Sequence, residues 1–122
     1  MIRDALREFA QQQLRPHAAT WDRERCFPRE ALKQLAQLGA FGIAVPEADG
    51  GAGLDYLALA LVIEEIAAGD GGTSTVISVN NCPVCSIGMS YADEAQKTQW
   101  LRPLARGDML GAFALTEPHA GS

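Results

Sequence analysis

The sequence has few basic side chains, which restricts the classes of molecule that it can bind. Ten Lys and Arg stand against 15 Asp and Glu in 122 residues, which gives a formal net charge of −5. The ten basic residues are scattered along the chain and form no continuous basic patch. A nucleic-acid partner requires such a patch to neutralise its phosphates, so we expect no nucleic-acid binding.

Long apolar runs and cysteine are also scarce. The longest apolar run, residues 56–63, ends at Glu64 and falls short of the roughly 18 residues that cross a bilayer. The first residues lack the basic-then-apolar pattern of a secretory signal. Three cysteines, an odd number without such a signal, favour a reducing compartment. We therefore expect a cytoplasmic protein with no membrane span.

The composition that remains is that of an ordinary globular protein. Hydrophobic residues make up 48% and charged residues 20%, which argues against intrinsic disorder and against a coiled coil. A length of 122 residues suits one domain, or one domain and part of the next. The sequence stops in a Pro/Gly loop directly after an apolar run, where natural termini are rare. We therefore expect that the parent protein continues into a second domain.

Apolar residues at steps of three and four predict helix over most of the chain. The first stripe covers residues 2–21, where Pro16 predicts a kink or a break because it has no backbone N–H. Pro28 opens a second helix, which Gly39 ends.

Two more helical regions follow a glycine-rich loop. Asp55 is placed to cap a helix over residues 56–68. That helix is apolar nearly all round, so we expect it to be the most buried one. Residues 73–91 form the next helical region, which we expect to be interrupted near Asn81 and Pro83.

The end of the chain changes character. Asp93 and Gln96 have the spacing of a capping box, and the helix they begin ends before Gly107. Residues 109–116 are apolar and are expected to form the only strand. Helices followed by one strand predict an all-α, bundle-like domain and the beginning of a β-domain.

Cys82 and Cys85 have the CxxC spacing of redox and zinc sites. Redox use requires a helix start in a βαβ setting, and zinc requires a second pair or histidines. Cys26 and both histidines are remote in the sequence. We interpret the pair as two buried thiols. A metal or redox module is the alternative, which bound zinc would support.

Two other patterns resemble functional sites but are better explained as structure. Glu64 and Glu65 are adjacent on a helix and point about 100° apart, so they do not converge as an acid and a base. We expect one to reach solvent and the other a helix end or a basic partner. The glycine-rich residues 50–53 lack the Lys-Ser/Thr of a P-loop and the GxGxxG spacing. We interpret them as a turn between helices.

Seven motifs occur together in one order along the whole chain, although any one alone would be poor evidence. They are Arg7-Glu-Phe-Ala with Leu14-Arg-Pro; Trp21-Asp22 before Phe27-Pro28; Leu38-Gly39-Ala-Phe-Gly-Ile; Val45-Pro46-Glu with Gly50-Gly51-Ala-Gly53-Leu; Glu64-Glu65-Ile-Ala; Gln96-Lys97 through Trp100-Leu-Arg-Pro-Leu-Ala-Arg-Gly107; and Ala114-Leu-Thr-Glu-Pro-His-Ala-Gly-Ser122. In this order they resemble the N-terminal part of the acyl-CoA dehydrogenase family of flavoproteins.

The resemblance implies a helical domain over residues 1–108 and the first strand and loop of a middle β-domain over 109–122. It implies an FAD enzyme that oxidises acyl-CoA to trans-2-enoyl-CoA in fatty acid metabolism. A glutamate beyond Ser122 would remove the α-proton while a β-hydride passes to the flavin. An electron-transfer flavoprotein would take the electrons, and the parent would be a homo-oligomer. Alternatives are an acyl-CoA oxidase, a flavin monooxygenase, or a non-catalytic helical interaction module.

The same resemblance implies a set of site residues. The cofactor-binding residues would be Phe113, Ala114, Leu115, Thr116, Gly121 and Ser122, and the substrate-binding residues would be Ser122, Thr75, Val76 and Val79. No residue of the chain is expected to be catalytic or to bind a metal. His119 departs from the family's usual glycine, and Asn80 from its usual histidine. We expect the 122-residue chain alone to be inactive and to bind FAD weakly or not at all.

Overall fold

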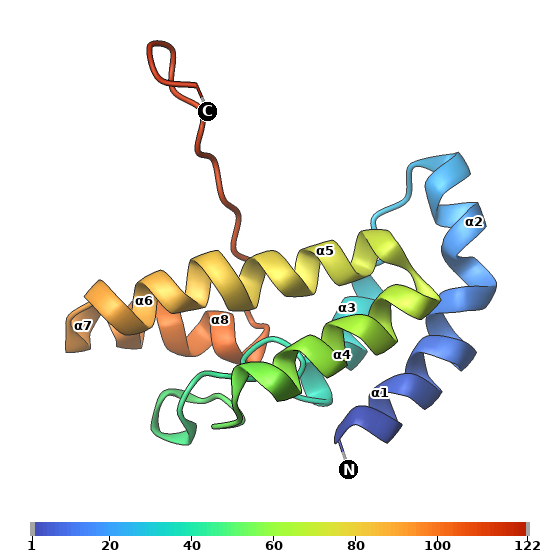
Figure 1. Cartoon of the computed structure of the whole chain (residues 1–122), viewed down its shortest axis with the longest axis horizontal. Coiled ribbons are helices and arrows are strands. Elements are labelled where there is room, and N and C mark those ends of the chain that lie inside the picture. Colours follow the sequence, from blue (N-terminus) through green and yellow to red (C-terminus); the bar gives the residue numbers. More distant parts are fainter. Residues whose placement is uncertain (1, 122) are drawn as a thin grey trace.

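Helices make up most of residues 2–121, the part of the chain that the computed structural model describes (Figure 1). In chain order they are α1 (Ile2–Phe9), α2 (Arg15–Glu24), α3 (Arg29–Gln37), α4 (Tyr56–Gly69), α5 (Gly71–Val79), α6 (Ser86–Tyr91), α7 (Glu94–Gln96) and α8 (Arg102–Arg106). Three π-helical segments join successive helices, at Ala10–Leu14, Asn80–Cys85 and Lys97–Leu101. The predicted all-α fold is confirmed. Within the described residues, no helix is long and apolar enough to span a bilayer.

Each π-helical segment is associated with a proline. Pro83 lies inside one segment, and Pro16 and Pro103 each follow one by two residues. Proline has no N–H to donate to the residue four positions back. A wider turn, in which Arg15 N–H donates to Ala10 O, lets the helix continue. Of the kink or break predicted at Pro16, the break does not occur, because the helix continues through the π-helical distortion at Ala10–Leu14. The interruption predicted in residues 73–91 is likewise a π-helical segment, within one long rod.

Local signals set most helix ends as predicted. The Asp55 carboxylate accepts the backbone N–H of Ala58 at 2.8 Å and caps α4. Gly39 has φ +77° and ends α3. The capping box at the start of α7 is also formed. Asp70 was missed: its carboxylate accepts the N–H of Thr73 at 2.7 Å and starts α5 two residues earlier than expected.

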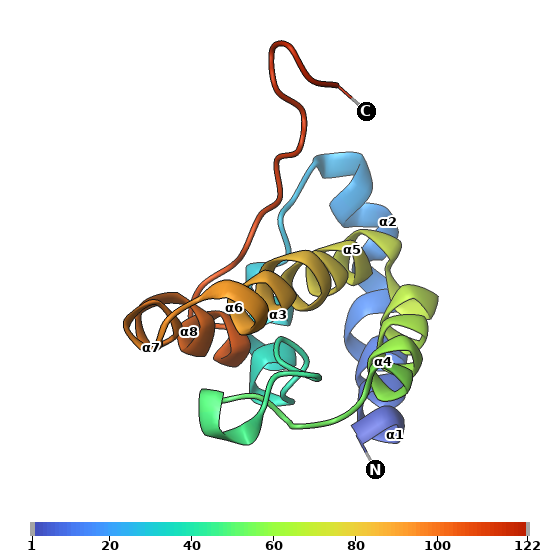
Figure 2. The same cartoon turned by 60° about the vertical axis from the view of Figure 1, so that its left-hand side comes forward.

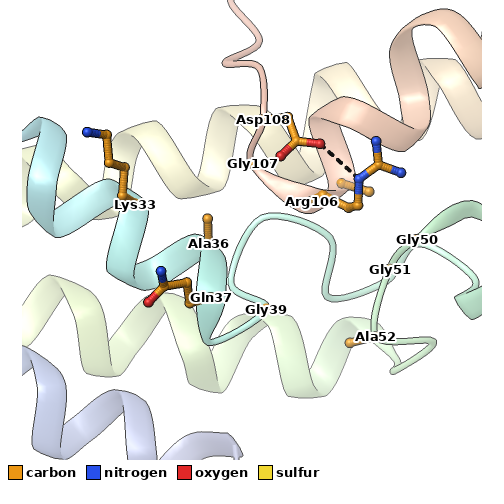
Figure 3. A pocket seen from close by; sticks show the side chains of 11 residues that line it. Lys33, Ala36, Gln37, Gly39, Gly50, Gly51, Ala52, Arg106, Gly107 and Asp108 are labelled. Atoms are coloured by element: carbon orange, nitrogen blue, oxygen red, sulfur yellow. Dashed lines mark hydrogen bonds and ion pairs between the residues drawn. The ribbon is translucent and has the colours of Figure 1, made fainter.

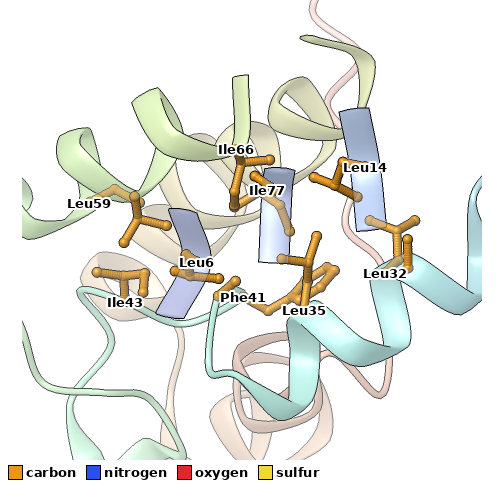
Figure 4. Close-up of a cluster of buried hydrophobic side chains, with 13 residues drawn as sticks. Leu6, Leu14, Leu32, Leu35, Phe41, Ile43, Leu59, Ile66 and Ile77 are labelled. Atoms are coloured by element: carbon orange, nitrogen blue, oxygen red, sulfur yellow. The ribbon is translucent and has the colours of Figure 1, made fainter. Parts of the chain in front are cut away.

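The main core lies where α1, α3, α4 and α5 converge (Figure 4). Its largest members are Leu6, Leu14, Leu32, Leu35, Phe41, Ile43, Leu59, Ile66 and Ile77. A smaller cluster around Leu101 and Cys85 joins α8 to the Asn80–Cys85 segment. The expectation that α4 is the most buried helix is confirmed, because five of its residues are buried and no other described helix has more than three. It is not buried all round, since Leu57 is 67% exposed.

Glu65 ties α4 to α1. Its buried carboxylate accepts hydrogen bonds from Arg3 Nε at 2.8 Å and Arg7 Nε at 2.9 Å, whereas Glu64 is exposed. The expected divergence of the two carboxylates is confirmed. Hydrogen bonds from Arg7 and then Arg3 lower the pKa of Glu65 from 4.5 to about 2.

The Glu65 cluster predicts acid sensitivity. Between pH 4.5 and about 2 the unfolded chain takes up a proton at Glu65 that the folded chain does not. Stability is therefore full above this window and falls as the pH drops through it. Thermal unfolding from pH 6 downward should show a steeper loss of Tm in the wild type than in Glu65→Gln. Glu64→Gln is the matched control and should follow the wild type, and parallel curves for all three would contradict the prediction.

The predicted strand over residues 109–116 is wrong. These residues leave the helical body as an extended segment, which we call the arm (residues 109–121; Figures 1 and 2). Within the described chain the sole β-type pairing is the isolated bridge between Glu117 and Ala120. A strand requires a neighbour with which to exchange hydrogen bonds. The apolar sequence is therefore extended here but unpaired.

Candidate functional site

An apolar pocket of about 350 Å³ lies where the arm passes α5. Its walls come from the loop between α2 and α3, from α5, and from the root of the arm. The lining residues are Phe27, Thr75, Val76, Val79, Leu110, Gly111, Ala112 and Phe113. None of them is charged, so the pocket suits an apolar group.

Four residues selected from the sequence meet in this pocket. Thr75, Val76 and Val79 come from α5, and Phe113 reaches the pocket from the arm. Val76 and Val79 are three positions apart and share one helix face. The Thr75 hydroxyl donates to Gly71 O at 3.1 Å, so its polar group is already used within α5. The α5 wall is therefore largely hydrocarbon.

The other selected residues do not line the pocket. Ala114, Leu115 and Thr116 continue along the exposed arm beyond it, and Gly121 lies near the arm's end. Ser122 lies outside the described residues. The sequence prediction therefore identified the α5 wall of the pocket and one residue of its arm-side wall, Phe113. Its other residues lie on the arm beyond the pocket or outside the described residues.

Sequence reasoning missed half of the lining residues. Phe27 is 49% exposed, and the Arg29 guanidinium carbon lies 5.5 Å from the centre of its ring. The available signal was an aromatic residue in a loop, outside every helical stripe. Leu110, Gly111 and Ala112 directly precede Phe113 in the same apolar run. Extending the site back along that run would have found them.

The arm also offers backbone donors. Among the described residues, the backbone N–H groups of residues 112–116 make no hydrogen bond, and the side chain of Thr116 is exposed. Extended backbone with free N–H groups and a hydroxyl can bind the edge of a polar planar ring. The donor set of the arm therefore fits one edge of a flavin.

The glycine-rich loop has no free donors of this kind. Ala52 N–H donates to Gly42 O at 2.8 Å, Gly53 N–H to Val45 O at 2.8 Å, and Leu54 N–H to Ile43 O at 2.9 Å. A phosphate cradle requires N–H groups that point outward unpaired. The loop is used to fold the chain back on itself, in agreement with its interpretation as a turn.

A wider pocket of about 580 Å³ lies between this loop, α3 and α8 (Figure 3). Lys33 and Arg106 are its basic residues. Arg106 Nε already donates to the Asp108 carboxylate at 2.9 Å, and both side chains are exposed. An exposed ion pair of this kind contributes little. This pocket brings together none of the site residues selected from the sequence.

The thiols of the CxxC pair differ in exposure. Cys85 is fully buried, which raises its pKa to about 11, whereas Cys82 is half-buried. Because the thiolate is the reactive form, Cys85 is a poor nucleophile. The described residues bring together no group of three His, Cys, Asp or Glu that could hold a metal ion. Both findings disfavour the alternative of a metal or redox module.

Comparison with known proteins decides the family. A family profile described as acyl-CoA dehydrogenase, N-terminal domain, matches residues 1–108. The chain belongs to the acyl-CoA dehydrogenase family. Over all of its 122 residues this acyl-CoA dehydrogenase chain is 42% identical to the mitochondrial short-chain specific acyl-CoA dehydrogenase of Rattus norvegicus, of which it covers 30%.

Solved structures agree with this family. A chain in the structure of the electron transferring flavoprotein of Acidaminococcus fermentans is 37% identical, with a TM-score of 0.93 over 99% of this chain and 32% of that one. The acyl-CoA dehydrogenase of Bacillus anthracis complexed with FAD is 32% identical, with a TM-score of 0.86 over 99% of this chain and 21% of that one. This acyl-CoA dehydrogenase chain therefore spans about a third or less of the proteins it matches.

Proposed function

We propose that residues 1–108 are the N-terminal helical domain of an FAD-dependent acyl-CoA dehydrogenase and that residues 109–122 begin its middle domain. The observation that carries the proposal is the uncharged pocket between α5 and the arm, in a chain of this family. The whole enzyme oxidises an acyl-CoA to the trans-2-enoyl-CoA. The acyl tail lies against Thr75, Val76 and Val79, where its hydrocarbon is removed from water.

FAD is held along one edge by the arm. Phe113, Ala114, Leu115 and Thr116 contact it through their unpaired backbone N–H groups and the Thr116 hydroxyl. Gly121 and Ser122 complete the set of residues assigned to the cofactor, and Ser122 is also assigned to the substrate. The bound flavin supplies the acceptor for the hydride from the β-carbon. The described residues contribute one side of this site only, so FAD binding requires the rest of the enzyme.

The base that removes the α-proton lies in another part of the enzyme. No Asp or Glu lines the pocket among the described residues. The one carboxylate with a strongly shifted pKa, Glu65, is bound to Arg3 and Arg7 and does not line the pocket. The role of this chain is therefore to bind and orient substrate and cofactor.

The electron acceptor, location and assembly follow from the same proposal. The matched chain in the Acidaminococcus fermentans electron transferring flavoprotein structure supports an electron-transfer flavoprotein as the partner. The composition supports a cytoplasmic location, and the named relatives support a role in fatty acid metabolism. We place the whole enzyme among homo-oligomers.

The full-length protein provides the test. It should be purified yellow, and anaerobic butyryl-CoA should bleach its oxidised-flavin absorbance and yield the trans-2-enoyl-CoA. The 122-residue chain, assayed in parallel, should be colourless and inactive. A full-length protein that lacks flavin or is inert toward acyl-CoAs would refute the proposal. Rapid reoxidation of the bleached flavin by oxygen would favour the acyl-CoA oxidase or flavin monooxygenase instead.

One observation favours the rival of a helical interaction module. A second apolar groove of about 360 Å³ lies between α6 and the Lys97–Leu101 segment, with Ile87 50%, Tyr91 83% and Trp100 46% exposed. Exposed apolar surface of this kind mediates association or aggregation. Light scattering of the 122-residue chain tests the rival, because a clean monomer at high concentration counts against it.

A further inference from the structure

The Asn80 carboxamide connects three separate parts of the chain. Asn80 is fully buried at the start of the Asn80–Cys85 segment. Its Nδ2 donates to Phe41 O at 2.9 Å and to Leu104 O at 3.1 Å. Its Oδ1 accepts the backbone N–H of Gly111 at 3.0 Å. One side chain therefore joins the loop after α3, the end of α8 and the root of the arm.

The backbone at Gly111 packs closely against Val84 and leaves no space for a side chain. A Cβ at Gly111 would lie 2.5 Å from Val84 Cγ1 and 2.8 Å from its Cγ2. Asn80 and Val84 belong to the same π-helical segment, so one segment supplies both the hydrogen bond and the close packing. Wide turns of this type are often found at functional sites. The root of the arm is therefore fixed against the rod that carries α5.

The pocket depends on this attachment. Leu110, Gly111, Ala112 and Phe113 form its arm-side wall. At the first residue of the arm, Met109 N–H donates to Pro103 O at 3.3 Å; beyond it, the described arm makes one hydrogen bond to the helical body, from Gly111 to Asn80. Without that bond the wall formed by residues 110–113 is held by apolar contact alone, so the distance between this wall and α5 is less tightly fixed.

We infer that Asn80 is a positioning residue that sets the width of the acyl pocket by holding the arm against α5. The inference rests on the proposed function for the identity of the occupant, but the attachment itself does not. Asn80 touches neither the pocket nor its contents, because it acts through the Gly111 amide. The departure from the family's usual histidine at position 80 therefore affects the residue that sets the width of the acyl pocket.

The attachment is tested in the 122-residue chain by amide exchange. Asn80→Ala should speed solvent exchange of the Gly111 amide about tenfold, measured by NMR. Asn80→His should restore protection, because a neutral imidazole has one donor and one acceptor and can keep the Gly111 bond. Ser86→Ala, in the same rod, is the control and should leave Gly111 unchanged. Equal exchange in the wild type and Asn80→Ala would overturn the inference.

Gly111→Ala provides a second test of the attachment if Asn80→Ala does not fold. It displaces the arm by its clash with Val84 and leaves the Asn80 bonds to Phe41 and Leu104 in place. In Gly111→Ala the amide of residue 111 should exchange faster and the core amides should not. Slow exchange retained at the residue 111 amide would overturn the inference.

The full-length enzyme tests the effect on selectivity. Asn80→Ala and Gly111→Ala should each raise the ratio of kcat/KM for hexanoyl-CoA to that for butyryl-CoA about fivefold, and Asn80→His should return it toward the wild type. A purely structural role lowers the amount of active enzyme and leaves this ratio unchanged, which would overturn the inference. A protein inert toward both thioesters would instead refute the proposed function, and amide exchange would still decide the attachment.

Discussion

Asn81→Ala should lower the free energy of unfolding by about 3–5 kcal/mol, the largest effect we expect from one substitution. Asn81 is 2% exposed, and its Oδ1 accepts Ile43 N–H at 2.9 Å. Its Nδ2 donates to Ala40 O and Ile77 O, both at 2.9 Å. Alanine leaves Ile43 N–H and Ala40 O buried without partners, whereas Ile77 O still accepts the Asn80 N–H. Each orphaned group costs about 1–3 kcal/mol.

Urea and thermal unfolding of the 122-residue chain measure this loss. A Tm lower by roughly 10–20 °C is expected for a chain of this size. Gln99→Ala removes the same carboxamide from an exposed helical position and should shift Tm by no more than a few degrees. If the free energies of unfolding of Asn81→Ala and Gln99→Ala differ by less than about 1 kcal/mol, the hydrogen bonds of Asn81 contribute less to stability than their geometry indicates.

The Asn81 network also shows where sequence reasoning reaches its limit. The capping signals of Asp55 and of the α7 box act over three or four residues, so they could be read directly from the sequence. The partners of Asn81 in the 40–43 loop lie 38 and 41 residues away. The sequence predicted an interruption near Asn81 and Pro83, whereas the helical rod continues there and the Asn81 carboxamide is buried with both its ends hydrogen-bonded.

The site was predicted unevenly for a related reason. Val76 and Val79 were selected because the resemblance placed them on an acyl wall, and helical spacing brings them together on one face. Phe27 comes from a loop whose path depends on how α2 and α3 pack, which no local pattern encodes. The strand over residues 109–116 failed because pairing is a property of two segments, and the described chain contains only one of them.

Val79→Phe in the full-length enzyme should shift the preference toward the shorter of two acyl chains that differ by two methylenes. Val79 is half-buried on the α5 wall, and a phenyl ring there fills space in a pocket of about 350 Å³. Each methylene buried is worth about 0.8 kcal/mol, so excluding two of them costs about 1.6 kcal/mol. The ratio of kcat/KM for hexanoyl-CoA to that for butyryl-CoA should therefore fall about 15-fold.

The matched control is Ile87→Phe, which adds an aromatic ring to the separate groove between α6 and the Lys97–Leu101 segment. It should leave the hexanoyl-to-butyryl ratio unchanged, because that groove shares no lining residue with the acyl pocket. Val79→Ala should raise the ratio, since it enlarges the same wall. A ratio that stays constant across all three variants would mean that the acyl tail lies elsewhere. A fall confined to Val79→Phe would tie the hydrocarbon of the substrate to α5.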